Sequence, residues 1–304
     1  MTHHPLLGLV AATHTPFDAD GELHLPSVER QAEHLLDWGV NQVFIGGSTG
    51  ESASLSYVER DALTRRWTEV AVGTELRVIV HVGGNCLREA GALAATAQAC
   101  GAAAVAMLTP SYFKPANVDV LLECCASVAA HAPELPFYYY DIPVMTGVLL
   151  PMADFLARGR ERIPNLAGLK WTNPDLFNYQ RCRAADGGSF DLLWGTDEAL
   201  LAALAVGARG AVGSTYNLAA PLYHRLIAAF EAGDMAAARA EQLRSVELVR
   251  TLAGYGFMGA AKAVMGMLGV PVGPARLPNT NPSAEQLPKL RAELEQLGFF
   301  DWLA

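Results

Sequence analysis

The sequence predicts an α/β fold, a (β/α)8 TIM barrel followed by a C-terminal helical extension. Eight short apolar runs rich in β-forming residues recur along the chain, roughly 20 to 37 residues apart. Most stretches between them place apolar residues at helical spacing. Eight strands that alternate with helices match a closed parallel barrel. An open doubly wound sheet is the alternative, but residues 7–16 lack the glycine fingerprint that normally follows its first strand.

The strands and helices can be placed from these patterns. We expect the strands at residues 7–12, 42–45, 77–82, 103–108, 137–142, 166–170, 190–194 and 210–214. Helical spacing is clearest at residues 28–38, 87–100, 118–130, 152–157 and 198–206. Residues 221–232 are expected to form the eighth barrel helix, because Pro221 is tolerated in a first helical turn.

The remaining residues, 233–304, are expected to form helices that pack on the catalytic barrel of residues 1–232. The first helix is predicted at 234–253 with Asp234 as its N-cap, and the second at 257–268. The third is predicted at 283–297, where Ser283 would cap the first turn. A connector rich in proline and glycine separates the last two helices, so we expect an appendage rather than an independent domain.

Composition excludes several classes of function. The net charge of −9 and the absence of a Lys/Arg run argue against nucleic acid as a partner. No apolar stretch approaches the ~20 residues of a transmembrane helix, and no signal peptide is evident, so no membrane association and a cytoplasmic location are expected. The five cysteines have no regular spacing, and no metal-binding motif occurs. We expect a protein that binds a small-molecule substrate without a metal.

The strand predicted at 166–170 ends in Lys170, which makes it the most informative strand of the chain. Burying an ammonium costs several kcal/mol unless the group is paired or loses its proton. Lys170 is therefore either a structural ion-pair partner or a reactive amine with a lowered pKa. In a barrel, the C-terminal ends of the strands line the active site. Similar polar clusters end three of the other strands, at residues 46–51, 195–198 and 213–217.

The cluster at residues 46–50 is rich in glycine and hydroxyl groups and leads into a helix. Exposed backbone N–H groups in such a turn suit a carboxylate or a phosphate, although glycine can simply permit a tight turn. The same residues match the G-x-S-x-G elbow of serine hydrolases, with Ser48 as nucleophile. That alternative needs a histidine in a later catalytic loop, and none of the histidines has an obvious place there.

Tyr138 and Tyr140 lie two residues apart in the strand predicted at 137–142, so they share one face. That face would point into the barrel beside Lys170, although core packing alone would also account for either tyrosine. A buried phenol needs a hydrogen-bond partner, which an amine or substrate oxygens would supply.

These stretches carry a family resemblance. Gly-Gly-Ser-Thr-Gly-Glu at 46–51, Tyr-Asp-Ile-Pro at 140–143, Gly-Leu-Lys at 168–170 and Gly-Ser-Thr-Tyr-Asn at 213–217 resemble the dihydrodipicolinate synthase/N-acetylneuraminate lyase superfamily. Their order and spacing match over nearly the whole chain. Within the superfamily, the chain is most similar to the N-acetylneuraminate lyases, because Ser48-Thr49 stands where the synthases usually have two threonines. The stretch 271–278 is also similar to the animal-type lyases.

The resemblance implies a class I aldolase that assembles as a homotetramer and uses no cofactor. Lys170 matches the Schiff-base lysine, Tyr140 the proton-relaying tyrosine, and Ser48 the first of two residues that hold the substrate carboxylate. The other implied substrate-binding residues are Thr49, Gly47, Tyr112, Thr172, Gly195, Asp197, Glu198 and Ser214. Tyr112 would enter a neighbouring subunit's site, and residues from Thr172 onward would hold the polyol chain of a sugar acid.

One departure from the synthase pattern bears on the substrate. Met145 stands where the synthases have an arginine that orients a carboxylate-bearing aldehyde, and methionine cannot make that bidentate contact. The expected reaction is therefore reversible cleavage of N-acetylneuraminate to pyruvate and N-acetylmannosamine. Trp171 and Thr196 depart mildly from the lyase pattern and leave the size of the substrate open. A related aldolase or dehydratase of another 2-keto-3-deoxy sugar acid, a serine hydrolase using Ser48, and a non-catalytic sugar-acid sensor are the alternatives.

Overall fold

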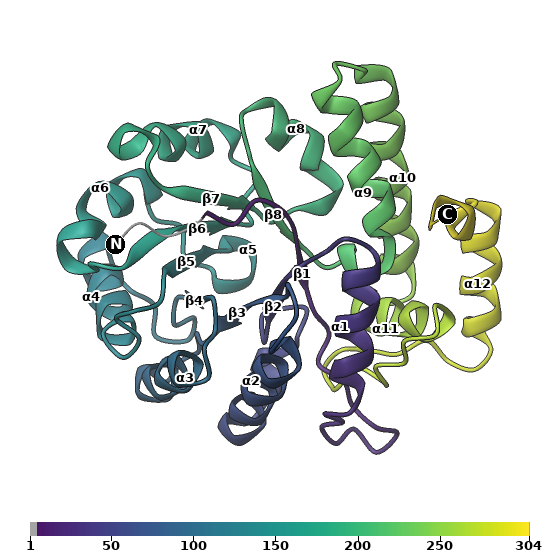
Figure 1. Cartoon of the computed structure of the whole chain (residues 1–304), viewed down its shortest axis with the longest axis horizontal. Helices are drawn as coiled ribbons and strands as arrows, with labels where there is room; N and C mark the ends of the chain where they lie inside the picture. The colour runs from purple at the N-terminus through teal and green to yellow at the C-terminus, as the bar shows by residue number, and fades with distance from the viewer. Residues whose placement is uncertain (1–4, 304) are drawn as a thin grey trace.

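A computed structural model describes residues 5–303 and shows a closed barrel of eight parallel strands in chain order (Figure 1). The strands are β1 (Gly8–Ala12), β2 (Gln42–Ile45), β3 (Arg77–His81), β4 (Ala104–Leu108), β5 (Phe137–Asp141), β6 (Leu166–Trp171), β7 (Asp191–Trp194) and β8 (Gly210–Gly213). β1 pairs with β8 and closes the barrel. All eight predicted strands are confirmed, within two residues at each end.

The helices surround the barrel and cover its outer surface. They are α1 (Ser27–Asp37), α2 (Tyr57–Ala71), α3 (Leu87–Ala99), α4 (Val118–Ala129), α5 (Pro143–Thr146), α6 (Met152–Arg162), α7 (Leu176–Ala184), α8 (Leu200–Ala205) and α9 (Tyr216–Glu231). Short 3-10 turns occur at η1 (Ser52–Ser54), η2 (Ala185–Gly188) and η3 (Asp197–Ala199). Within residues 5–303, no helix is long and apolar enough to cross a membrane.

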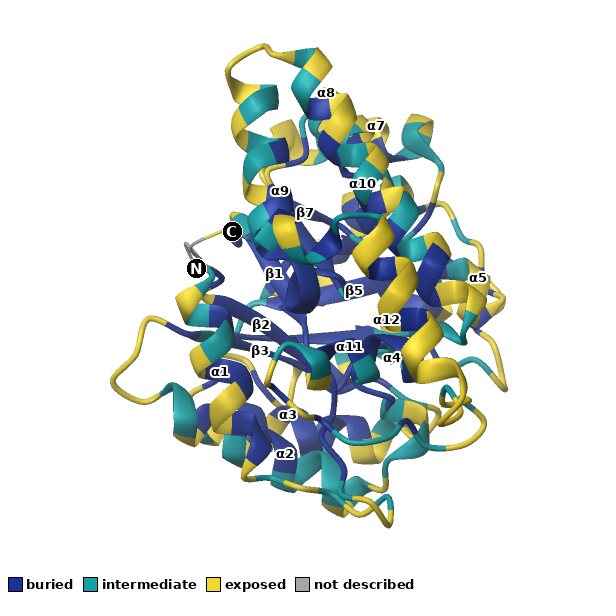
Figure 2. Ribbon diagram, turned by 90° about the vertical axis from the view of Figure 1, so that its right-hand side faces the viewer, coloured by how far each residue is buried: buried dark blue, intermediate teal, exposed yellow. Residues whose placement is uncertain are grey.

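Two apolar clusters explain the architecture. Inside the barrel, side chains such as Val10, Ile79 and Tyr140 pack together, and a larger cluster fills the space between the strands and the helices. Figure 2 shows this as buried strands enclosed by helices whose outer faces are exposed. Because parallel strands covered on both sides bury both of their faces, they are recognisable in the sequence as nearly continuous apolar runs.

The eighth barrel helix is longer than predicted. α9 begins at Tyr216, five residues before the predicted start at 221, and Pro221 lies inside it. Ala219 has non-helical backbone angles (φ −150°), so the chain kinks there and Pro221 falls at the start of the regular segment. The predicted helix 198–206 is likewise divided, into η3 and α8.

The C-terminal extension consists of α10 (Met235–Gly254), α11 (Phe257–Met267), α12 (Gln286–Gln296) and η4 (Phe299–Leu303). Asp234 caps α10 by accepting a hydrogen bond from Ala237 N, as predicted. Ser283 accepts one from Gln286 N, although α12 begins three residues later than predicted. Figure 1 shows the extension beside α9 and α1. Its apolar side chains, including Leu248 and Val264, belong to the same cluster as the barrel core.

Candidate active site

The amine of Lys170 lies inside the barrel at the C-terminal end of β6. The residue is 3% exposed, and Nζ lies 4.0 Å from the ring centroids of both Phe44 and Tyr140. No carboxylate within residues 5–303 pairs with it at ion-pair distance. Burial lowers the pKa of Lys170, and the neighbouring Tyr140 and Asp197 only partly oppose this shift. Burial therefore makes the amine easier to deprotonate than a lysine in water, and a nucleophilic lysine needs this change.

Tyr140 joins the lysine to the glycine-rich loop. Its ring faces the amine, and its hydroxyl lies 3.5 Å from Ser48 Oγ. Tyr138 and Tyr140 share the inner face of the barrel, as predicted. The partner of Tyr138 is not the lysine but Asp191 Oδ2, which accepts a 2.9 Å hydrogen bond from its hydroxyl. Asp191 begins β7, so this bond lies one layer nearer the N-terminal ends of the strands.

Two carbonyl groups of the loop at residues 46–51, those of Gly46 and Gly50, are held by the surrounding protein. His81 Nδ1 lies 2.8 Å from Gly46 O, and Thr15 Oγ1 donates to Gly50 O at 2.6 Å. His81 Nε2 accepts a hydrogen bond from Leu108 N, which leaves the proton on Nδ1 for Gly46. Burial and the nearby Arg60 lower the pKa of His81 to about 3, so the imidazole is neutral.

With these carbonyls engaged, the loop presents donors. Among residues 5–303, no protein acceptor engages the backbone N–H groups of Ser48 and Thr49. The Ser48 and Thr49 hydroxyls add two further donors, and Thr49 Oγ1 lies 2.6 Å from Ser214 Oγ. Such a turn can hold a carboxylate. No histidine within residues 5–303 forms a hydrogen bond with Ser48, so the geometry of a hydrolase triad is missing here.

The loops after β7 and β8 are tied together by a buried carboxylate. Asp197 Oδ2 accepts hydrogen bonds from Thr215 N at 2.8 Å and Thr215 Oγ1 at 2.7 Å. Thr215 Oγ1 also contacts Tyr223, which bonds Ser245 of α10. Burial raises the pKa of Asp197 to about 6, although the bonds from Thr215 oppose the shift. Asp197 is thus engaged within the protein, whereas its neighbour Glu198 is exposed to solvent.

Thr172 and Gly195 meet at the ends of β6 and β7. A Cβ atom on Gly195 would lie 1.9 Å from Thr172 Oγ1, so this position has room only for glycine. The Thr172 hydroxyl is buried and has no hydrogen-bond partner within residues 5–303. An unpaired buried hydroxyl is unfavourable, which makes it a candidate for contact with a substrate.

Tyr112 does not join the other candidate site residues within this chain. It is 79% exposed, and its ring packs edge-on against Phe113 at a centroid distance of 5.0 Å. Met145 lies in α5 and is 68% exposed. Lys114 covers the end of the same loop, because a Cβ atom on Gly147 would lie 2.5 Å from its Nζ. Lys114 comes from a different loop, and its position beside Gly147 was not predicted from the sequence.

Several residues around the site were not identified from the sequence. Phe44 follows the period of two that places alternate residues of β2 inside the barrel, so this signal was available. His81 was placed correctly in β3, but its bond to Gly46 depends on the fold. Asp141 accepts a 3.0 Å hydrogen bond from Asn173 Nδ2, which links the end of β5 to the segment that follows β6. Burial raises the pKa of Asp141 to about 6.

Comparisons with known proteins agree on one family. The family model for the "Dihydrodipicolinate synthetase family" matches residues 5–297. The N-acetylneuraminate lyase of Gallus gallus is 41% identical over 296 residues, with 96% of each chain covered. The solved N-acetylneuraminate lyase of Proteus mirabilis aligns with a TM-score of 0.94 at 38% identity, covering 97% of this chain and 100% of the other.

A more distant solved structure adds a chemical detail. A Ruminococcus gnavus sialic acid aldolase, described as a catalytic lysine mutant, aligns with a TM-score of 0.91 at 26% identity. The alignment covers 96% of each chain. The fold is therefore shared with proteins whose alignments cover 96% and 97% of this chain.

Proposed function

This chain belongs to the dihydrodipicolinate synthetase family, and we propose that it is a class I aldolase that cleaves N-acetylneuraminate reversibly to pyruvate and N-acetylmannosamine. The observation that carries the proposal is the buried amine of Lys170, next to Tyr140. The Tyr140 ring lies against that amine, and its hydroxyl lies 3.5 Å from Ser48 Oγ in the donor-rich turn at Ser48 and Thr49. A serine hydrolase is disfavoured because Ser48 has no histidine partner in the described chain. A non-catalytic sugar-acid sensor is disfavoured because Lys170 and Tyr140 are both present.

Lys170 supplies the covalent step. Its neutral amine attacks the C2 ketone of the open-chain sugar acid, and loss of water forms an iminium ion. The C3–C4 bond then breaks, its electron pair moves toward the iminium, and the C4 hydroxyl becomes the aldehyde of N-acetylmannosamine. Protonation of the resulting enamine at C3 and hydrolysis release pyruvate and regenerate the amine. The description of a relative as a catalytic lysine mutant supports the role of this residue.

Tyr140 accepts a proton from the substrate, and the glycine-rich turn binds the substrate carboxylate. Tyr140 takes the proton of the C4 hydroxyl, through the substrate carboxylate held beside it. The backbone N–H groups and hydroxyls of Ser48 and Thr49, next to Gly47, hold that carboxylate. The carbonyls of Gly46 and Gly50, on either side of these donors, are already hydrogen-bonded, so little reorganisation should accompany binding.

The polyol chain of the substrate extends toward the loops after β6, β7 and β8. Thr172 offers an unpaired hydroxyl, Glu198 offers an exposed carboxylate, and Ser214 lies beside Thr49. Asp197 and Gly195 complete this wall. Because Asp197 already accepts two hydrogen bonds, a shorter 2-keto-3-deoxy sugar acid is the second candidate substrate.

We further propose that the chain is a cytoplasmic homotetramer in which Tyr112 enters a neighbouring subunit's site. The support is a set of exposed apolar side chains on the loops around the site, which a soluble monomer rarely leaves in water. These are Tyr112, Phe113, Val144 and Leu149, each at least 75% exposed. The five cysteines are free thiols, as suits a reducing compartment. Light scattering would measure the mass, and a monomer at working concentration would contradict the assembly.

A coupled assay for pyruvate release across a panel of sugar acids tests the substrate. N-acetylneuraminate should be cleaved with the highest kcat/KM, and aspartate semialdehyde should not be condensed, because Met145 offers its carboxylate no guanidinium. A fluorophosphonate probe should leave Ser48 unlabelled. Preference for a shorter keto-deoxy sugar acid would replace the lyase with its sister aldolase. Labelling of Ser48 without pyruvate release would favour the hydrolase.

A further inference from the structure

Glu51 ends the glycine-rich loop in a backbone conformation that needs external support. Its φ of 54° lies in the left-handed region, where residues other than glycine are disfavoured. The side chain is fully buried. Its own N–H donates to Ser48 O at 3.0 Å, so the conformation of Glu51 sets the turn that carries Ser48 and Thr49.

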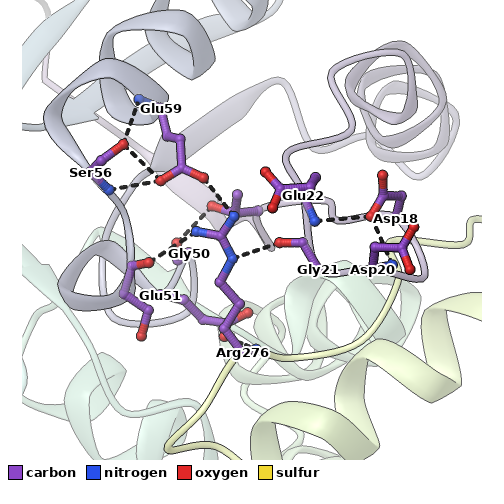
Figure 3. Close-up of polar contacts among 11 residues, drawn as sticks. Asp18, Asp20, Gly21, Glu22, Gly50, Glu51, Ser56, Glu59 and Arg276 are labelled. Carbon is purple, nitrogen blue, oxygen red and sulfur yellow. Dashed lines mark hydrogen bonds and ion pairs between the residues drawn. The ribbon is translucent and has the colours of Figure 1, made fainter.

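The partners that hold the Glu51 carboxylate all come from the C-terminal extension. Lys262 Nζ of α11 lies 2.7 Å from Oε1, and both side chains are 0% exposed. Oε2 accepts directed hydrogen bonds from Arg276 N at 2.8 Å and from Asn279 Nδ2 at 3.2 Å. Figure 3 shows Glu51 beside Arg276.

The segment that carries Arg276 is itself fixed to the barrel. Its guanidinium donates to Gly21 O at 2.8 Å and to Glu59 Oε1 at 2.5 Å, as Figure 3 shows. It also stacks over the ring of Phe17 at 4.1 Å. The extension therefore presents a preorganised set of donors to Glu51, and the loop receives its support from more than 200 residues away in sequence.

The surroundings of Lys262 provide one carboxylate counterion within residues 5–303, which is Glu51. Its amine also donates to Pro274 O at 2.8 Å and lies 4.2 Å from the Phe17 ring. Burial lowers its pKa to about 8, and Glu51 opposes that shift while Arg276 adds to it. The remaining titratable neighbour, His14, is buried and neutral, because burial and Lys262 lower its pKa to about 3. Glu51 is the only carboxylate within residues 5–303 that pairs with Lys262.

We propose that Glu51 is a positioning residue, through which Lys262, Arg276 and Asn279 of the C-terminal extension hold the Ser48–Thr49 turn in the geometry that binds the substrate carboxylate. The inference rests on the proposed function, since that function makes the turn the carboxylate site. Removal of Lys262 leaves the Glu51 charge buried without its counterion. Such a charge is strongly unfavourable, so the side chain moves toward water and takes the turn with it.

Trapping of pyruvate with sodium borohydride tests the proposal, because pyruvate carries the carboxylate but not the sugar. The measured quantity is the pyruvate concentration that gives half-maximal labelling of Lys170. For Lys262→Met we expect this pyruvate concentration to rise about tenfold. A change of this size is expected when one charge-assisted hydrogen bond to the pyruvate carboxylate is misaligned. The double variant Glu51→Gln/Lys262→Met should recover most of this loss, because a neutral amide stays inside and still accepts from Arg276 N.

Two controls separate positioning from general stability. Glu241→Gln neutralises a buried carboxylate of α10 whose ion pairs are with Arg225 of α9 and Arg244 of α10, not with the loop at residues 46–51. It should lower Tm yet leave pyruvate trapping unchanged. Inhibition by N-acetylmannosamine, which has no carboxylate, should keep its inhibition constant in Lys262→Met. Asn279→Ala removes one donor without changing charge and should raise the half-labelling concentration about threefold.

The outcomes are distinct. If wild type is not labelled, the proposed function fails, and this inference fails with it. If wild type is labelled and folded Lys262→Met traps pyruvate as well as wild type does, the positioning role is overturned while the aldolase stands. If Lys262→Met does not fold, Asn279→Ala decides: unchanged trapping in that variant contradicts the proposal, and weakened trapping with unchanged N-acetylmannosamine inhibition supports it.

Discussion

Tyr140→Phe and Tyr138→Phe make the same chemical change on the same face of β5, and we expect opposite consequences. Tyr140 has its ring 4.0 Å from Lys170 Nζ and its hydroxyl 3.5 Å from Ser48 Oγ. Tyr138 donates instead to Asp191, one layer away from the amine. Only the first hydroxyl is placed to move a proton of the substrate.

The magnitudes follow from what each substitution removes. Tyr140→Phe keeps the ring against the amine and should change stability by less than about 1 kcal/mol, because the lost contact is long. Turnover should fall about 10²–10⁴-fold, the usual size of a proton-transfer contribution. Tyr138→Phe removes a 2.9 Å bond to a carboxylate and should destabilise the protein by about 1.5–3 kcal/mol, with turnover nearly unchanged.

Thermal unfolding and steady-state pyruvate release measure the two effects separately. Borohydride trapping with pyruvate should persist in both variants, because Lys170 is intact in each. Near-normal turnover in Tyr140→Phe would remove Tyr140 from the mechanism. Equal loss of turnover in the two variants would show that the effect is one of barrel packing rather than proton transfer.

Three further predictions concern the walls of the site. Gly195→Ala should weaken sugar-acid binding and lower stability by about 1–3 kcal/mol, because its Cβ would lie 1.9 Å from Thr172 Oγ1; Gly254→Ala, whose Cβ meets nothing within 4 Å, is the control, and equal Tm values for the two would contradict this. Glu198→Ala should lower kcat/KM for N-acetylneuraminate about 10–150-fold and spare pyruvate trapping, and a silent substitution would point to a shorter substrate. The pKa of Asp141 is raised to about 6, so the folded protein binds this proton more tightly than the unfolded chain does. Its contribution to stability is present below about pH 4 and is lost as pH rises through about 6. Asp141→Asn should therefore raise Tm relative to wild type more at about pH 7.5 than at about pH 4.5, and a pH-independent difference would refute the shifted pKa.

The order of the barrel could be predicted because its strands are buried on both faces, which leaves continuous apolar runs in the sequence. Lys170 and Tyr140 could be located because the C-terminal ends of these runs meet at one end of the barrel. Residues that act across the fold could not be found in this way. Arg276 bonds Glu51 from 225 positions away, and no spacing rule connects them. The early start of α9 depended on a kink at Ala219, and alanine gives no local signal for one.

The sequence also could not predict which side chains the site residues contact. Asp197 was expected to face the substrate, which stays a prediction, and the structure shows that it joins two loops through Thr215. The role of Tyr112 in a neighbouring site stays a prediction, as does the division at residue 232. In each case the missing information is which side chain lies across a gap, and only the folded chain fixes that arrangement.

Mass spectrometry of the borohydride-trapped protein tests the central claim most directly. Wild type treated with pyruvate and borohydride should gain one reduced pyruvyl group per chain, and peptide mapping should place it on Lys170. Lys170→Met should gain nothing, although Lys262 and the other lysines remain. An unlabelled wild type, or a label that persists in Lys170→Met, would contradict the assignment of Lys170 as the Schiff-base residue.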